Sequence, residues 1–420
     1  MSTATAPSQS IPTAAETDPQ TLGWMQGFPP PLDKTITFHN GSFRSFPKLR
    51  WAWSNIRQLV PTVNVWRGAG PVSVLPRAEQ DIGASASVTM DGRPMTFERM
   101  LEETYADGIA VLHRGKLIYE RYFGALKPHK PHISMSVTKS FTGTLAAMLI
   151  GEGALDADAK VARYLPELAQ SGFGDATVAE VLDMTTAIDF TENYEGQSPT
   201  MQAYRQATGF DPRREGEEGP QSVYAFLAAV PKQGAHGERF TYRTPNVDVI
   251  SWLIARVTGK PVAAVLSERI WSRIGAEDDA FLQVDPTGVP LAGSAFNARL
   301  RDLARFGEVM RLGGAWNGQQ VVPAAVVTDI RRGASREGFA KAGYATLPGW
   351  SYHNFWWVSH DDHGAFTARG IHGQAIYVDP KAEMVIARFA SHPLAGNVNL
   401  DPTSLPAYRA VADHLIRHSR

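Results

Sequence analysis

Apolar and polar positions alternate most regularly near the C-terminal end of the chain and after its first hundred residues. Residues 108–124 (GIAVLHRGKLIYERYFG) contain two apolar runs around a short His-Arg-Gly-Lys turn, a pattern typical of a β-hairpin. Residues 374–389 (QAIYVDPKAEMVIARF) predict a second pair of strands around an Asp-Pro-Lys turn. Residues 404–418 carry apolar side chains at helical spacing. Strands at both ends with helices between them predict one α/β sheet domain closed by both termini.

Helical periodicity dominates the middle of the chain. Phe141, Leu145 and Leu149 share one helical face until a Gly-Glu-Gly sequence ends the pattern. The same periodicity predicts helices over residues 178–184, 222–230 and 247–257. In contrast, residues 197–220 are polar and interrupted by Gly and Pro, which predicts a long surface loop or lid.

These patterns predict two lobes preceded by a leader. Residues 1–22 are rich in Ser, Thr, Ala and Pro and are expected to be a flexible leader, whereas the Trp-rich stretch that follows is expected to wrap over the body. We expect residues 23–135 and 290–420 to form the α/β sheet domain. Residues 136–289 are expected to form a mostly helical lobe.

Composition narrows the class of protein. Lys and Arg (41) almost balance Asp and Glu (42), so the chain lacks the positive excess that nucleic-acid binding usually requires. No apolar run approaches the about 18 residues of a membrane span. The leader has no basic segment followed by an apolar one, so we expect a cytoplasmic protein. The absence of cysteine excludes thiol catalysis and thiolate metal sites, so a covalent mechanism needs Ser, Thr, Lys, Tyr or a carboxylate.

The sequence Ser-x-x-Lys occurs twice, and the two copies differ in their expected geometry. In the copy that begins at Ser45, Pro47 disfavours helical geometry for the residue before it. In the second copy, Ser136 and Lys139 open the amphipathic helix, where three-residue spacing places both side chains on one face. A neutral lysine can take the proton of the serine, and burial lowers the pKa of a lysine in that direction. Gly-x-Ser-x-Gly does not occur.

Several motifs resemble those of the penicillin-recognising serine hydrolases, which include serine β-lactamases, DD-peptidases and family VIII-type carboxylesterases. Within this group the chain is most similar to the 6-aminohexanoate-dimer hydrolases, the nylon-oligomer amidases. The resemblance implies an α/β (α+β sandwich) fold of β-lactamase/transpeptidase type, with an antiparallel sheet flanked by helices, an all-helical lobe and an active site between the lobes. The motifs, in chain order, are MSVTKS at 135–140, VLDM at 181–184, FTY at 240–242, NVDV at 246–249, WW at 356–357 and GIHGQ at 370–374.

The resemblance also implies catalytic roles. Ser136 would be the acylated nucleophile, Lys139 its base, and Tyr242 the phenol that carries the proton to the leaving group. The backbone N–H groups of Ser136 and Ile371 would form the oxyanion hole, next to Gly370, because glycine lets a strand approach a ligand closely.

The same resemblance implies a set of substrate-binding residues, which are Tyr194, Asn246, Trp357, Gly370 and His372. The family pattern Tyr-x-Asn reads Tyr-Arg-Thr-Pro-Asn here, so the asparagine is displaced.

Charged residues near the implied site bear on the substrate. Where the nylon-oligomer amidases carry an acidic residue that pairs with the substrate ammonium, this chain has Tyr204 or Arg205, and Arg369 lies beside the oxyanion strand. We therefore expect a neutral or anionic small ester or amide as substrate.

Other functions remain as alternatives. A β-lactamase or DD-peptidase shares the nucleophile motif, and so does a sensor or binding protein that is acylated without turnover. The sequence implies no organic cofactor and no metal, because the His360-Asp-Asp-His363 stretch is expected to be a solvated turn. The oligomeric state is open between a monomer and a homodimer.

Overall fold

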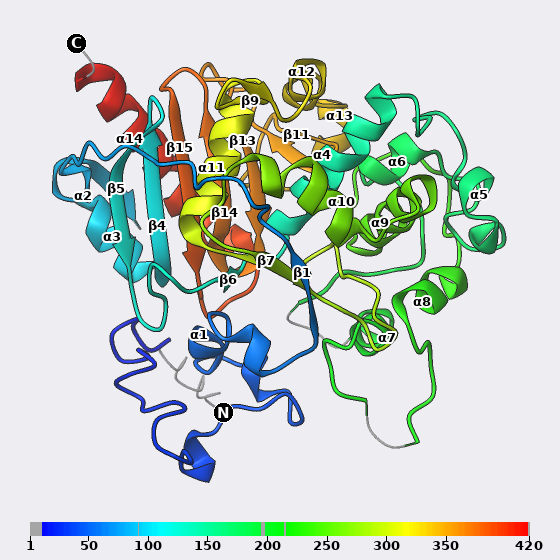
Figure 1. The fold of residues 1–420 in the computed structure, drawn as a ribbon, viewed down its shortest axis with the longest axis horizontal. Coiled ribbons are helices and arrows are strands. Elements are labelled where there is room, and N and C mark those ends of the chain that lie inside the picture. The colour runs from blue at the N-terminus through cyan, green and yellow to red at the C-terminus, as the bar shows by residue number, and fades with distance from the viewer. Residues whose placement is uncertain (1–10, 91, 195–197, 214–215, 419–420) are drawn as a thin grey trace, which may run out of the picture.

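The large antiparallel sheet and a group of seven helices occupy different sides of the molecule. The computed structural model describes residues 11–90, 92–194, 198–213 and 216–418. Figure 1 shows the strands of a large sheet on one side and the helices α4–α10 gathered on the other.

The large sheet has seven antiparallel strands in the order β11-β12-β13-β14-β15-β4-β5. Both predicted hairpins are confirmed, as β4–β5 and as β14–β15. Because β15 pairs with β4, the two hairpins lie side by side and join segments from distant parts of the chain. The strands are β4 (Ala106–His113), β5 (Lys116–Tyr122), β11 (Ser351–His353), β12 (Trp356–Val358), β13 (Phe366–Gly370), β14 (Gln374–Asp379) and β15 (Met384–Ala390).

Alternate side chains of the central strands enter two different cores. Val385 and Ala387 of β15 face the large core, which includes Phe306 of helix α11 (Leu300–Arg311). Ile386 lies in the core beneath helix α14 (Asp401–His418), together with Val411. A strand alternates its side chains between the two faces, so helices cover both faces of the sheet. The predicted C-terminal helix is confirmed and begins three residues earlier than expected.

A smaller sheet connects the N-terminal wrap to the rest of the molecule. Its strand order is β1-β7-β8-β6, with β1 (Thr62–Val65), β6 (His132–Ile133), β7 (Ala280–Gln283) and β8 (Phe296–Ala298). The Trp-rich stretch is ordered, as the sequence predicted: Phe43, Leu49 and Trp53 pack against Ile133 and Met135, just before the predicted nucleophile.

The helices predicted over residues 178–184, 222–230 and 247–257 are confirmed with small changes at their ends. Helix α4 crosses between the two sides, and a Cβ at its Gly143 would lie 2.0 Å from the carbonyl oxygen of Asn354, so glycine is needed for this close packing. The helices of this side are α4 (Val137–Gly151), α5 (Val161–Tyr164), α6 (Val178–Leu182), α7 (Pro199–Ala207), α8 (Val223–Ala229), α9 (Pro245–Thr258) and α10 (Val262–Arg269). The remaining helices and strands are α1 (Leu49–Ala52), α2 (Ile82–Ser85), α3 (Phe97–Glu103), α12 (Ala324–Arg332), α13 (Arg336–Ala340), β2 (Ser87–Met90), β3 (Arg93–Thr96), β9 (Ala315–Trp316) and β10 (Gln319–Gln320).

The prediction of a loop throughout residues 197–220 was wrong, because helix α7 lies within it. The hydroxyl of Ser198 caps the helix by accepting from the Met201 N–H, and Pro199 occupies the first turn. Met201 and Tyr204 are buried on one face at a spacing of one helical turn. Residues 195–197 and 214–215 of the predicted loop lie outside the described residues.

The predicted leader divides into two parts. Residues 1–10 lie outside the described residues, whereas residues 11–22 contact the body. Arg50 Nη1 donates to the carbonyl of Ala14 and, at 2.9 Å, to Thr17 Oγ1. The hydroxyl of Tyr105 donates to the carbonyl of Pro12. This second part of the leader is therefore held by buried side chains of the body.

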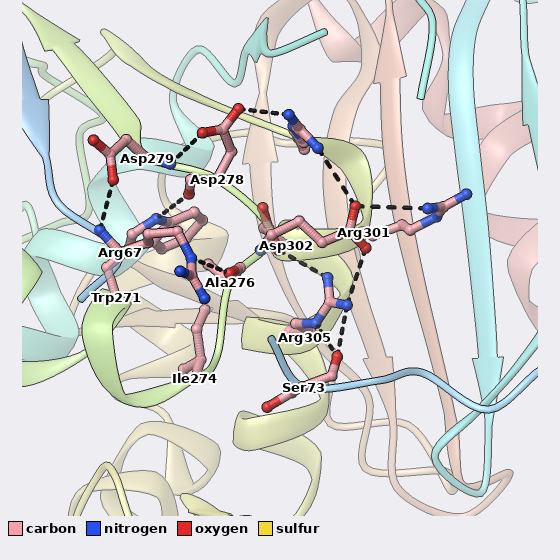
Figure 2. A network of polar contacts seen from close by, with 12 residues as sticks. Arg67, Ser73, Trp271, Ile274, Ala276, Asp278, Asp279, Arg301, Asp302 and Arg305 are labelled. Carbon is pink, nitrogen blue, oxygen red and sulfur yellow. Dashed lines mark hydrogen bonds and ion pairs between the residues drawn. The ribbon is translucent and has the colours of Figure 1, made fainter. Parts of the chain in front are cut away.

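A polar network fastens helix α11 to the segments beside it (Figure 2). The guanidinium of Arg305 donates to Asp302 Oδ1 at 2.8 Å, to the carbonyl of Ser73 at 2.7 Å and to Glu277 Oε1 at 3.0 Å. Arg305 is almost fully buried, and the carboxylates of Asp302 and Glu277 compensate its charge. The network therefore supports the scaffold around the sheet.

Helix length and apolar character decide whether a helix of the described ranges could span a membrane. There, no single helix is both long and apolar enough to cross a bilayer. One pair of consecutive helical segments, Pro245–Thr258 and Val262–Arg273, which are bent by 73° relative to each other, is long and apolar enough only when the two are taken together.

Candidate active site

Ser136 lies where strand β6 turns into helix α4. The turn is made by Met135, whose φ of 48° is in the left-handed region that is rare for residues other than glycine. Ser134 fixes the approach, since its N–H and its hydroxyl both donate to the carbonyl of Phe296 at 2.8 Å. Ser136 is the N-cap residue of α4, yet its side chain makes no capping hydrogen bond. Its hydroxyl is therefore not used to cap the helix.

The Lys139 ammonium is placed beside that hydroxyl. Nζ lies 3.1 Å from Ser136 Oγ and 3.0 Å from Thr244 Oγ1, and it also donates to the carbonyl of Gly293. Lys139 is 1% exposed, and burial lowers its pKa below the ordinary value of a lysine, although the negative charges of Glu192 and Asp248 oppose this shift. A lysine of this kind loses its proton more readily than a solvated one and can act as a base.

Two residues that the sequence analysis missed connect Lys139 to the wall of the site. The Thr244 hydroxyl accepts from Lys139 and donates to Glu192 Oε1 at 2.5 Å, while the Thr244 N–H donates to the other oxygen of Glu192. Glu192 also accepts from the Tyr194 hydroxyl. Thr244 follows Tyr242 by two residues, which is the spacing of the family pattern Tyr-x-Asn, and this spacing was the signal that could have identified it.

Tyr242 lies against both Lys139 and the aromatic side of the site. Lys139 Nζ is 5.3 Å from the centre of the Tyr242 ring, and this ring stacks on Trp357 with 5.7 Å between centroids. Burial, and then the charge of Glu192, raise the pKa of Tyr242 well above its usual value, while a hydrogen-bonding contact with Ser136 acts in the opposite direction. The phenol is therefore protonated at neutral pH and can donate.

The end of strand β13 reaches the segment that precedes the nucleophile. A Cβ added to Gly370 would lie 2.7 Å from the carbonyl oxygen of Ser134 and 3.0 Å from Met135 Cβ, so glycine permits the contact. Ile371 follows at the start of the short helix η6 (Ile371–Gly373) and lines both cavities next to Ser136.

Two cavities meet at Ser136. The larger, of about 360 Å³, extends between the N-terminal wrap and helix α7, and the smaller, of about 170 Å³, extends along the aromatic cluster. Ser136, Tyr194 and Ile371 line both cavities, whereas Tyr242 and Trp357 line the smaller. The hydroxyl of Ser136 is thus accessible from two sides, as a nucleophile that divides a substrate into two parts must be.

The structure brings the predicted binding residues Tyr194, Trp357 and His372 to these cavities, but neither Gly370 nor Asn246 lines them. Asn246 is fully buried; its Oδ1 accepts from the Thr186 hydroxyl at 2.7 Å and its Nδ2 donates to the carbonyl of Arg243 at 3.1 Å. The side-chain amide of Asn246 is therefore used within the protein, and the hydroxyl of Thr244, not Asn246, contacts Lys139.

His372 lines the larger cavity with one ring nitrogen engaged. Its Nδ1 lies 2.6 Å from the carbonyl of His392, and its ring lies 4.7 Å from that of Trp53. Burial lowers the pKa of His372 to about 4, although the bond to His392 opposes this shift. The imidazole is neutral at physiological pH and holds the backbone after Ile371 in place.

The charged residues that the sequence placed near the substrate differ in their surroundings. Arg369 forms a buried ion pair with Asp401 and lies 5.0 Å from the Trp357 ring, so its charge is compensated. Tyr204 donates to Asp248 Oδ2 at 2.6 Å. Arg205 lines the larger cavity.

Two other motifs have separate structural roles. Lys48 of the first Ser-x-x-Lys copy lies over the Trp24 ring at 5.2 Å. The expectation that His360 and His363 form a solvated turn was wrong for His363, which is buried with Nδ1 2.7 Å from Asp379 Oδ2. Within the described ranges no group of three or more His, Asp or Glu side chains is arranged to hold a metal ion.

Comparison with known proteins adds to this geometry. The family model described as Beta-lactamase matches residues 96–403. The 6-aminohexanoate-dimer hydrolase of Paenarthrobacter ureafaciens is 35% identical over 353 residues, which cover 84% of this chain and 88% of that protein. Esterase EstB of Burkholderia gladioli is 27% identical over 217 residues, which cover 48% of this chain and 53% of that protein.

Solved structures agree with these matches. The "Putative 6-aminohexanoate-dimer hydrolase from Bacillus anthracis" superposes with a TM-score of 0.82 at 30% identity, covering 89% of this chain and 96% of its own. A family VIII carboxylesterase has a TM-score of 0.53 at 17% identity, covering 72% of this chain and 92% of its own, and shares the fold. The fold is thus the β-lactamase/transpeptidase-like arrangement that the sequence motifs implied. The family match over most of its length shows that the chain belongs to the Beta-lactamase family and is one of its serine hydrolases.

Proposed function

We propose that this enzyme hydrolyses a small amide or ester through an acyl-enzyme on Ser136. The observation that carries the proposal is the pair formed by Ser136 Oγ and Lys139 Nζ, 3.1 Å apart, with the lysine buried and its pKa lowered. A serine hydroxyl needs such a neighbour to lose its proton at neutral pH.

In the acylation step, neutral Lys139 takes the proton of Ser136 while Oγ forms a bond to the substrate carbonyl carbon. Negative charge then develops on the carbonyl oxygen, and the backbone N–H groups of Ser136 and Ile371 are proposed to stabilise it. The bond to the leaving nitrogen or oxygen breaks, and the leaving atom takes the bonding electron pair and a proton from Tyr242. Lys139 returns a proton to Tyr242.

Water completes the reaction. It attacks the acyl carbon and gives up a proton to neutral Lys139, which passes a proton to Ser136 Oγ as the bond from Oγ to the acyl carbon breaks and the carboxylic acid is released. The protonated, buried phenol of Tyr242 and the two cavities on either side of Ser136 support this scheme.

The names of the relatives support the substrate class. One relative is named for hydrolysis of the 6-aminohexanoate dimer and another as an esterase. We therefore propose a small-molecule amide or ester, held by walls that include Tyr194, Trp357 and His372, with Gly370 beside Ile371 at the proposed oxyanion hole.

The organisation of the chain around the site is part of the proposal. Ser136, Lys139 and Tyr242 come from residues 136–289, and Ile371 comes from residues 290–420, which supports an active site between a helical lobe and a sheet domain. The cytoplasmic location expected from the sequence is tested by cell fractionation, and the choice between monomer and homodimer by light scattering of the purified chain.

A fluorophosphonate probe followed by intact-mass analysis tests the nucleophile. Wild type is expected to gain one adduct, and Ser136→Ala none. Ser45→Ala, which removes the serine of the other Ser-x-x-Lys copy, is the matched control and is expected to be labelled like wild type. Labelling of Ser136→Ala at the wild-type level would show that the nucleophile is a different residue.

A substrate panel then tests the reaction class. We expect steady turnover of p-nitrophenyl esters or of cyclic-amide oligomers. Turnover of nitrocefin without ester or amide hydrolysis would instead identify a β-lactamase. A single burst of product without turnover would identify an acylated sensor.

A further inference from the structure

Two arginines from distant parts of the sequence meet at the larger cavity. Arg44 belongs to the short helix η2 (Ser42–Arg44) of the N-terminal wrap, and Arg205 belongs to helix α7. The pKa of Arg44 is lowered to about 10 by burial and then by the positive charge of Arg205, so the two guanidinium groups lie within electrostatic reach of each other.

The positive charge of this pair is not fully compensated. Arg44 forms an ion pair with Asp211, but its Nε is buried and has no hydrogen-bond partner. Arg205 is half-buried, and its guanidinium makes no hydrogen bond or ion pair with any residue that the structure describes. Asp211 therefore pairs with Arg44 alone, while the buried Nε of Arg44 and the guanidinium of the half-buried Arg205 have no hydrogen-bond partner among the described residues. Because buried polar groups are normally satisfied, this arrangement indicates a site for an anion.

The rest of the cavity wall cancels this charge only in part. Glu192 is the carboxylate among the lining residues; its charge acts on Lys139 as well as on Arg205, and its oxygens already accept from Tyr194 and from Thr244. The imidazole of His372 is neutral because burial lowers its pKa. The remaining wall includes apolar side chains that suit a hydrocarbon chain, namely Phe46, Leu49, Trp53, Met201 and Phe210.

The position of Tyr242 indicates which half of the substrate enters this cavity. Tyr242 lines the smaller cavity, and in the proposed reaction it protonates the leaving group. The leaving group therefore occupies the smaller cavity, where Arg369 is neutralised by Asp401. The acyl half is left to the larger cavity.

We infer that the larger cavity binds an acyl group that ends in a carboxylate, and that Arg205, assisted by Arg44, binds this carboxylate. The guanidinium group is suited to the task because its planar fork can donate two parallel hydrogen bonds to the two carboxylate oxygens. The inference rests on the proposed function and names its substrate class, the monoesters and monoamides of dicarboxylic acids.

Paired chromogenic substrates test the inference. The p-nitrophenyl monoesters of glutaric, adipic and pimelic acids are compared with their methyl-capped counterparts and with p-nitrophenyl 6-aminohexanoate. For at least one chain length we expect kcat/KM of the carboxylate to exceed that of both comparators by about 10-fold or more, as for a charge-assisted hydrogen bond. In Arg205→Gln the carboxylate-to-methyl ratio is expected to fall below about 2.

The matched control is Arg163→Gln, which removes an exposed arginine of helix α5 and is expected to keep the wild-type ratio. Inhibition of wild type gives a second measurement that needs no variant: the free dicarboxylic acid is expected to inhibit at about 10-fold lower concentration than its monomethyl ester.

The outcomes separate the two proposals. Equal turnover of carboxylate and methyl-capped esters, or an unchanged ratio in folded Arg205→Gln, overturns the anion site and leaves the serine hydrolase mechanism intact. Absence of any Ser136-dependent turnover overturns the proposed function and the anion site with it.

Discussion

Replacing Gly370 with alanine tests whether the end of strand β13 forms the oxyanion hole. The added Cβ would lie 2.7 Å from the carbonyl oxygen of Ser134, whereas ordinary van der Waals contact begins at 3.4 Å. The strand end and the segment before Ser136 must therefore separate by about 0.7 Å, the difference between these two distances. Both backbone N–H groups of the proposed oxyanion hole are attached to the parts that separate.

The expected loss follows from the geometry of hydrogen bonding. Removing one oxyanion donor costs about 100- to 1,000-fold in kcat, and displacing catalytic groups by about 1 Å costs about 100-fold. A displacement of this size should therefore lower kcat by about 10- to 100-fold. KM should change less, because the N–H groups bind the charge that develops in the transition state more strongly than the neutral carbonyl.

The assay is steady-state hydrolysis of a p-nitrophenyl ester, together with the rate of the acylation burst. Gly151→Ala at the end of helix α4 is the matched control, since its new Cβ would meet only Val326, at 3.9 Å, apart from the helix itself. Circular dichroism and thermal melting confirm that both variants are folded. A folded Gly370→Ala enzyme with kcat within about 3-fold of wild type would refute the assignment of the oxyanion hole to this strand end.

Three further substitutions test the surroundings of the site. Thr244→Val removes the hydroxyl between Lys139 and Glu192 and should lower kcat/KM by about 10-fold or more, while Thr244→Ser should retain most of the rate. In His372→Asn the new side chain suits the left-handed backbone of this position. Because burial lowers the pKa of His372 to about 4, the acid limb of the pH profile of kcat/KM should be the same in this variant as in wild type. A shifted acid limb would identify His372 as a catalytic histidine. Burial lowers the pKa of His353, but the hydrogen bonds and charges of Asp183 and Asp329 raise it, and the net shift is upward. Protonated His353 therefore stabilises the folded state in full below the pKa of the unfolded state. This stabilisation is lost as the pH rises through the pKa of the folded state. Urea unfolding should therefore show His353→Gln destabilised more at pH 6 than at pH 9, and an equal loss at both would contradict the ion-pair interpretation.

Local periodicity predicted the two hairpins and five of the helices, because each of these depends on neighbouring residues. The hairpin of β4 and β5 follows from two apolar runs and a tight turn, and helix α4 follows from an apolar face that ends at glycine. The pairing of β15 with β4 is different, since it joins residues more than 250 positions apart; the strand pattern predicted one sheet from both ends of the chain but not which strands are neighbours.

Helix α7 shows why polar composition is a weak guide to loops. Its mean character is polar, yet Ser198 supplies a cap, Pro199 suits the first turn, and Met201 and Tyr204 form a buried stripe. These local signals outweighed the Gly- and Pro-rich flanks. The helix matters for function because it carries Arg205 into the larger cavity.

The choice between Thr244 and Asn246 depends on where helix α9 begins. Pro245 is the first residue of the helix, so Thr244 is its N-cap residue and Asn246 lies in its first turn. Side chains two positions apart in a helix point about 200° away from each other, because each residue turns the helix by about 100°. The side chain of Thr244, next to Lys139, and that of Asn246, bonded to Thr186, therefore point in nearly opposite directions. Only Thr244 can contact the lysine. Aligning Asn246 with the asparagine of the Tyr-x-Asn pattern relies on residue type alone. The ammonium of Lys139 instead needs a hydrogen-bond acceptor at one fixed position, two residues after Tyr242. A threonine hydroxyl at the unshifted position meets that requirement, so the chemistry of the site is retained although the motif letter differs.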